Sequence, residues 1–179
     1  MRLHSRNGAF VELRAAPTRE EVTREEVTGG AGAGGAGAGG VTVTRETAGG
    51  EAAGQEAPGD ATALLVVEGI VDALDGRAWT FRSACLTRDE ARLLGDWLLR
   101  AAKGRVDLLE RLTFPVLSFT LDEHEYGQPR LVVGFSRETA PAWLGDERER
   151  TFDYPVTLDL TPESLEAAAV DWEREVRAG

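Results

Sequence analysis

The stretch LLVVEGIVDALDGRAWTFRSACLTRDEARLLGDWLLRAA, residues 64–102, decides the fold class of this chain. Leu64 to Leu74 is almost continuously apolar, and Arg77 to Ala84 is a second run rich in strand-forming residues. Between them, Asp75-Gly76 can take the positive φ angles that a tight two-residue turn requires. The sequence therefore predicts an antiparallel hairpin. Gly69, inside the first strand, indicates a bulge or a close backbone approach.

A helix is expected directly after this hairpin, from Thr87 to Ala102. Thr87 begins the sequence Thr-Arg-Asp-Glu, a capping box in which the Thr87 and Glu90 side chains bond amides that the first turn leaves unpaired. Gly104 provides a stop signal. The residues that share one helical face, and are therefore expected to be buried, are Ala91, Leu94, Leu98 and Ala101.

Further strands and a second helix are expected outside this stretch. Residues 8–14 (GAFVELR) have the composition of a short strand. Leu112 to Leu121 is apolar, but its alternation changes parity beside Pro115, which predicts a bulge or a strand bend. The other expected elements are a strand over 130–136, an alternating strand over 152–158 and a helix that Thr161 and Pro162 open.

Low-complexity sequence interrupts the chain after Pro17. TREEV occurs twice in residues 18–27, and residues 29–40 contain only Gly and Ala. Residues 15–60 carry too little large apolar surface to offset the entropy of ordering them. We therefore expect three segments: residues 1–14 as the N-terminal segment and first strand, residues 15–60 as a disordered insert, and residues 61–177 as the main part of a single domain.

Taken together, these elements predict an α+β fold. Because most of the connections between strands are hairpins, the sheet should be mainly antiparallel, with about six strands and two helices packed against it. The disordered insert should close as a surface loop between the first two strands, which costs little entropy even at this length.

Composition limits the function and the compartment. The net charge is −11, which argues against nucleic-acid binding and favours a basic partner. Cys85 is the single cysteine, so an intramolecular disulfide and a multi-cysteine zinc site are excluded. No segment approaches the roughly 18 apolar residues of a membrane span. We expect a cytoplasmic protein without membrane contact. The sequence carries no signal for the oligomeric state.

The distributed pattern resembles a known family. In the order of its segments, the chain resembles the WapI family of bacterial immunity proteins. These segments are GAFVEL, residues 64–104, LTFPVLSFTL, LVVGFS and finally FDYPVTLDLTPESLEAAAVDWEREV. The resemblance covers residues 8–14 and 62–177. It implies a non-enzymatic protein that binds and neutralises the toxic C-terminal region of a cognate, contact-delivered polymorphic toxin, in known cases a nuclease that acts on tRNA. It implies no cofactor.

Two acidic clusters and one tryptophan are the candidate partner-binding residues. A nuclease cleft is basic because it must attract a polyanion, so an acidic inhibitor can steer to it and cover it. Ordinary solvated turns are the alternative for both clusters, and the tryptophan could instead cover a sheet edge. The candidates are Asp122, Glu123 and Glu125 (the hairpin cluster), Asp146, Glu147 and Glu149 (the loop cluster), and Trp143.

Two other classes of function stay open. The first is a small metal-dependent or acid/base hydrolase that uses Glu123, His124 and Glu125. Consecutive turn residues do not converge on one site by themselves, and His4 lies near an N-terminus that is expected to be frayed. Cys85 follows an apolar strand and is interpreted as a small core residue. The second class is a regulatory or scaffold domain. We predict no catalytic, cofactor-binding or metal-binding residue.

Overall fold

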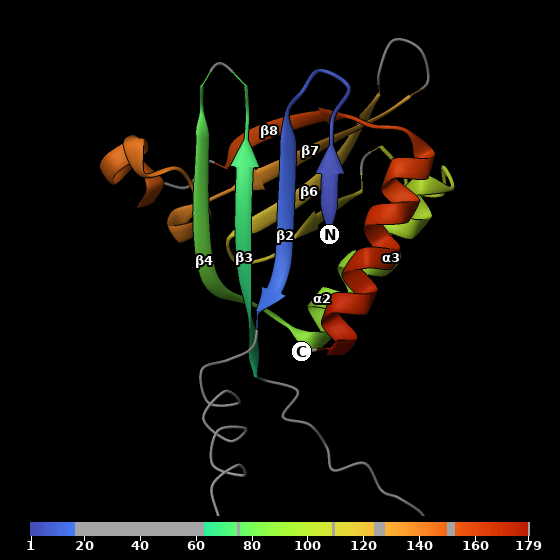
Figure 1. Ribbon diagram of the computed structural model, residues 1–179, viewed down its shortest axis with the longest axis horizontal. Helices are drawn as coiled ribbons and strands as arrows, with labels where there is room; N and C mark the ends of the chain where they lie inside the picture. The colour runs from blue at the N-terminus through green and yellow to red at the C-terminus, as the bar shows by residue number, and fades with distance from the viewer. Residues whose placement is uncertain (17–62, 75, 109, 124–127, 150–152, 179) are drawn as a thin grey trace, which may run out of the picture. The chain divides into compact units, whose positions relative to one another are not determined.

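The computed structural model describes residues 1–16, 63–74, 76–108, 110–123, 128–149 and 153–178 (Figure 1). The chain divides into two units, Met1–Thr18 with Ala61–Gly179, and Arg19–Asp60. The second unit, and with it most of the expected insert, lies outside the described residues.

The strands of the described residues form two antiparallel sheets of four strands each. Sheet A has the order β1-β2-β3-β4 and sheet B the order β5-β6-β7-β8. The α+β class and the antiparallel pairing are confirmed, whereas the expectation of one sheet of about six strands is wrong. The bounds are β1 Arg2–His4, β2 Phe10–Ala16, β3 Leu64–Asp72, β4 Ala78–Thr87, β5 Arg111–Thr113, β6 Leu117–Glu123, β7 Pro129–Phe135 and β8 Tyr154–Asp159.

Two short strands account for the difference in number. β1 comes from the expected frayed N-terminus, where Leu3 pairs with Val11 of β2 and is fully buried. β5 comes from the run that was expected to bend beside Pro115. That run is a hairpin, in which Phe114 N donates to Leu117 O at 2.8 Å and β5 pairs with β6. The change of parity therefore marks a reversal of the chain and not a bulge.

The hairpin of β3 and β4 is confirmed, and it has a bulge near its open end. Leu65 pairs with Leu86 and Val66 pairs with Ala84, so Cys85 has no partner across the ladder. This extra residue lets Cys85 and Leu86 both be buried although they are consecutive. At the other end, Arg77 N donates to Leu74 O at 3.0 Å and closes the turn.

Two helices, α2 (Arg88–Ala102) and α3 (Pro162–Ala178), lie side by side along the sheets (Figure 1). The capping box of α2 is confirmed: Glu90 N donates to Thr87 Oγ1 at 3.2 Å, and Thr87 N donates to Glu90 Oε2 at 2.8 Å. The helices are joined where Trp172 Nε1 donates to Ala91 O at 2.7 Å. No helix in the described part of the chain has the length and apolar composition that a membrane crossing requires.

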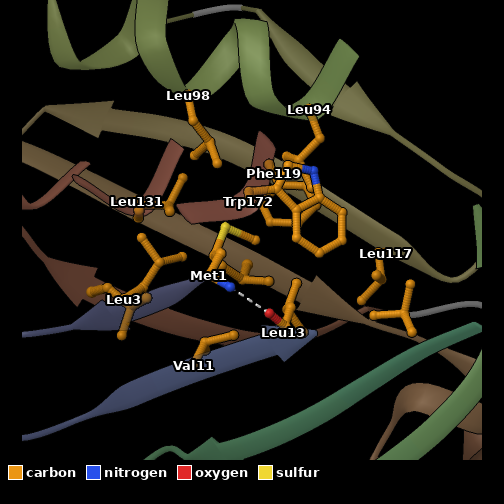
Figure 2. Packing of buried hydrophobic residues seen from close by; sticks show 14 of the residues in the cluster. Met1, Leu3, Val11, Leu13, Leu94, Leu98, Leu117, Phe119, Leu131 and Trp172 are labelled. Carbon is orange, nitrogen blue, oxygen red and sulfur yellow. Dashed lines mark hydrogen bonds between the residues drawn. The ribbon is translucent and has the colours of Figure 1, made fainter. Parts of the chain in front are cut away.

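The core is built from the inward faces of both sheets and from the facing sides of the helices. Figure 2 shows this packing, with Leu13 of sheet A, Phe119 of sheet B and Leu94 of α2 around the Trp172 side chain. Trp97 and Trp172 are fully buried. One continuous cluster of buried apolar residues thus joins all the layers of the first unit.

Candidate partner-binding surface

The loop cluster lies on a 3₁₀ segment, η3 (Ala142–Glu149), between β7 and β8. The segment is kinked at Gly145, whose φ of +56° is the left-handed conformation that glycine adopts most readily. Arg148 Nε donates to Arg137 O at 3.0 Å and holds the end of the segment to the short 3₁₀ turn η2 (Arg137–Thr139). The exposed side chains of the segment include Asp146, Glu147 and Glu149.

The sequence left two alternatives for Trp143, packing on a sheet edge or exposure to a partner, and the side chain is both packed and partly exposed. Its ring contacts Trp79 edge-on, with 5.5 Å between centroids, and also contacts Tyr154 at 6.3 Å. Trp79 is itself fixed, because its Nε1 donates to Thr139 O at 2.9 Å. Yet 51% of Trp143 is exposed. It is therefore an oriented aromatic side chain with one part packed on the sheets and the other in solvent.

The three carboxylates of the loop cluster are exposed on the segment 142–149. Within the described part of the chain, no ion pair joins Asp146, Glu147 or Glu149 to a basic side chain. Arg148 lies among them in the sequence, but its guanidinium Nε is bonded to a backbone carbonyl. Since a carbonyl is neutral, Arg148 keeps its positive charge, and the segment 142–149 carries three carboxylates and one guanidinium group.

The hairpin cluster is described only in part. Asp122 is exposed near the end of β6, opposite Arg130 of β7. The backbone of Glu123 ends β6 opposite Pro129, while its side chain and the residues His124 and Glu125 lie outside the described residues. The hydrolase hypothesis therefore rests on side chains that are not described. In the described ranges, no three His, Cys, Asp or Glu residues gather as metal ligands.

Asp122, the described side chain of the hairpin cluster, does not lie beside the loop cluster. β7 begins at Pro129, beside the hairpin cluster, and ends at Phe135, from which the chain passes through η2 to the loop cluster. A seven-residue strand spans about 23 Å, so Asp122 and the loop cluster lie near opposite ends of sheet B. In Figure 1, the end of β6 and the start of β7 lie at the far end of the sheet from the 3₁₀ segments.

The structure also shows a polar site that the sequence analysis missed. Ser118 Oγ donates to Asp153 Oδ2 at 2.6 Å, and Arg111 Nη2 donates to Ser118 Oγ at 3.0 Å and forms an ion pair with Asp153. These side chains lie over Gly134, where a Cβ would be only 2.7 Å from Asp153 Oδ2. The sequence held two signals for this polar site: Gly134 in β7, and the alternation of Ser118 and Thr120 in β6. They indicate a site only when the register of β6 with β7 is known.

This polar site lines the end of a groove of about 520 Å³ on the outer face of sheet B. Ser118 is only 4% exposed, whereas the Arg111 and Asp153 side chains are 53% and 28% exposed. The network is therefore anchored by a buried hydroxyl and offers its charged groups to solvent. Because Arg111 comes from β5 and Asp153 from just before β8, it links the two edges of the sheet.

Two further reactive side chains, Cys85 and His4, lie in the described part of the chain. Cys85 is 4% exposed, and burial raises the pKa of its thiol from 9.0 to about 11, which keeps it protonated at neutral pH. His4 stacks on Phe10, with 5.4 Å between ring centroids. Cys85 belongs to the buried core, so its interpretation as a small core residue is confirmed, whereas His4 is exposed.

Comparison with known proteins addresses the family directly. No curated protein and no solved structure matches the chain. A family model does match: its description is the immunity protein WapI-like family, and it covers residues 51–178, which include strands β3 to β8 and both helices. This match spans more than half of the sequence and agrees with the expected resemblance. The chain therefore belongs to the WapI-like immunity protein family.

Proposed function

We propose that this chain is a non-enzymatic immunity protein that acts in the cytoplasm by binding a cognate polymorphic toxin domain and blocking it. Its membership of an immunity family supports the role. The main structural support for binding as the mode of action is the side chain of Trp143. It is half exposed, it is oriented by Trp79 and Tyr154, and it lies on the same segment as the three carboxylates of the loop cluster.

The toxin domain that fits this surface is basic, and a nuclease is the candidate class. A nuclease must attract a polyanion, so Lys and Arg gather around its cleft. An inhibitor with a net charge of −11 is attracted to such a cleft over long range, which raises the association rate. Covering the cleft excludes the nucleic acid, and that mechanism needs no catalytic group on the immunity protein.

Trp143 supplies the short-range part of the proposed interaction. Tryptophan is enriched among the residues that contribute most to protein interfaces, because it buries a large area at a small cost in conformational entropy. The contacts of Trp143 with Trp79 and Tyr154 already restrict its ring. The loop cluster places negative charge on the same 3₁₀ segment as this apolar anchor, which suits a partner surface with an apolar pocket and a basic rim.

The direct test measures binding to the catalytically inactivated C-terminal domain of the cognate polymorphic toxin. Isothermal titration calorimetry should give a tight complex, and Trp143→Ala should weaken it by about 30-fold or more, as expected for a central anchor. Reversing the charge of the loop cluster with Asp146→Lys, Glu147→Lys and Glu149→Lys should slow association with the toxin domain, most strongly at low salt.

Matched variants on the helices provide the controls. Leu93 of α2 is 47% exposed, so Leu93→Ala truncates a comparable exposed apolar side chain far from η3. Reversing Asp96, Glu166 and Asp171 to Lys makes the same change in net charge. Both controls should bind nearly as the parent does. If the parent chain neither binds the toxin domain nor protects growth against it, the proposed function is refuted. If the control variants weaken binding as much as the Trp143 and loop-cluster variants do, the proposed binding surface is refuted.

A further inference from the structure

β4 forms one edge of sheet A, and the ladder shows which of its backbone groups face that edge. Ala73 N donates to Arg77 O at 3.0 Å, and such bonded pairs recur at every second residue of an antiparallel ladder. The odd-numbered residues from 79 to 83 therefore bond to β3. The β2 side gives the same alternation, since Leu13 N donates to Met1 O at 3.0 Å. The residues whose N–H and C=O groups point away from β3, and which we call the open edge of β4, are Ala78, Thr80 and Arg82.

The open edge of β4 is exposed, and in the described part of the chain no strand pairs with it. The turn η2 lies nearby, but it is held by two side chains that point to the inner side of sheet A. Trp79 Nε1 donates to Thr139 O at 2.9 Å, and Ser83 Oγ donates to Glu138 Oε1 at 3.0 Å. η2 therefore packs against the inner side of β4 and does not extend the sheet beyond it.

The edge strands β1, β5 and β8 are each protected against pairing with another chain. β1 and β5 have only three residues each. β8 contains Pro155, which has no N–H to donate, and its last residue is already bonded at the edge. There, Asp159 N donates to Ser5 Oγ at 2.8 Å, and Arg6 N donates to Asp159 O at 3.1 Å. Short length, proline and covered ends are the usual means by which proteins prevent pairing at sheet edges.

β4 differs from these strands along its open edge. It has ten residues and no proline, and its bulge at Cys85 lies outside the open edge. Arg82 is the one charged residue of the strand, and its side chain forms an ion pair with Glu68 on the outer face of sheet A. A strand edge of this kind binds another extended chain, because its outward N–H and C=O groups gain hydrogen bonds.

The open edge of β4 is continuous with the binding surface proposed above. Trp79 lies within it in the sequence, and the Trp79 ring contacts the Trp143 ring with 5.5 Å between centroids. In Figure 1, the orange segment η3 lies on the side of β4 that faces away from β3. A chain that pairs with the open edge therefore passes beside Trp143. A second copy of this protein fits less well than a basic toxin domain, because two chains with a net charge of −11 repel each other.

From these observations we infer that the open edge of β4 binds an extended segment of the toxin domain, which adds a strand to sheet A. This inference rests on the proposed function and deepens it, because it names the kind of segment that binds and the groups that hold it. The backbone of the segment bonds to Ala78, Thr80 and Arg82, and one of its side chains contacts Trp143. The backbone bonds supply affinity, while the side-chain contact supplies selectivity.

Two threonines at matched positions of edge strands test the inference. Thr80 of β4 and Thr157 of β8 are both exposed, and the N–H of each points away from the neighbouring strand. Proline at such a position removes the edge N–H and leaves the ladder bonds in place. Thr80→Pro should weaken binding of the inactivated toxin domain by about 30-fold in calorimetry, because it removes a hydrogen bond and obstructs the edge. Thr157→Pro should change the affinity less than about twofold, since surface changes away from an interface cost little.

Hydrogen exchange of the parent chain tests the same edge without a substitution. The Thr80 and Arg82 amides should exchange rapidly in the free protein and at least about tenfold more slowly in the saturated complex, whereas the Phe81 amide, bonded to β3, should be slow in both. Unchanged exchange at Thr80 and Arg82 in a complex that forms would overturn the inference and leave the proposed function standing. Protection that rises with concentration in the free protein would assign the edge to a second copy and also overturn the inference. A parent chain that does not bind the toxin domain would refute the proposed function, and the inference with it.

Discussion

Gly69 in β3 pairs with Phe81 in β4, and the ring of Phe81 occupies the space beside the glycine Cα. A Cβ at position 69 would overlap the ring, with Cδ1 only 2.7 Å away. Phe81 is 8% exposed and contacts Phe135 of sheet B edge-on, with 5.8 Å between centroids, so the ring cannot simply turn into solvent. The close approach that glycine indicated in the sequence is thus a contact that helps join the two sheets.

Gly69→Ala should therefore lower the free energy of unfolding by about 1–3 kcal/mol, the usual cost of adding a methyl group to a filled core. Urea denaturation followed by tryptophan fluorescence measures this change. The control is Gly95→Ala in α2, where the new methyl group meets the flexible Glu173 side chain at 3.3 Å. Because alanine favours a helix interior, Gly95→Ala should be neutral or stabilising by up to about 1 kcal/mol. Equal urea midpoints for Gly69→Ala and the parent would contradict the close contact.

At the scale of a single element, the junction of β4 and α2 depends on one side chain. Thr87 ends the strand and caps the helix, and its hydroxyl accepts from Glu90 N at 3.2 Å. Thr87→Ala removes this bond and should cost about 1 kcal/mol of stability, while Thr87→Ser keeps the hydroxyl and should cost much less. Urea unfolding of the two variants measures the difference. Equal losses would assign the effect to the lost methyl group and not to the cap.

Elements with local signals were predicted well from the sequence. The capping box at Thr87, the β3–β4 hairpin and the start of α3 at Thr161-Pro162 each depend on residues within a few positions of one another. The division into two sheets was not predictable in this way. It depends on which strand pairs with which, and the apolar run around Pro115 suits a bent strand as well as a three-residue strand followed by a turn.

The candidate site shows the same limit. Composition and turn position were enough to select Trp143 and the loop cluster as exposed candidates, and their exposure follows from η3. The network of Arg111, Ser118 and Asp153 joins residues 35 and 42 positions apart. No local pattern connects such residues, and the role of Gly134 beneath them is visible only in the register of β6 with β7.

At the scale of the whole molecule, Glu175 near the end of α3 connects the helix layer to sheet A. Its Oε1 accepts from the Met1 ammonium group at 2.8 Å, and its Oε2 accepts from Ala15 N at 3.2 Å. The same ammonium group donates to Leu13 O at 2.7 Å, as Figure 2 shows, while the Met1 side chain is 1% exposed in the core. One carboxylate thus holds a buried charge and a strand amide at once.

Glu175→Gln should lower the free energy of unfolding by about 1–3 kcal/mol, because the buried ammonium group loses its anionic partner and no water replaces it fully. The control is Glu166→Gln, an exposed position on the same helix that should change stability by less than about 0.5 kcal/mol. Urea denaturation at neutral pH compares the two variants, and hydrogen exchange of the Leu13 and Ala15 amides shows whether the loss is local. If Glu175→Gln is as stable as Glu166→Gln, then α3 is held to sheet A by apolar packing alone, and the contact of Glu175 with Met1 adds no stability.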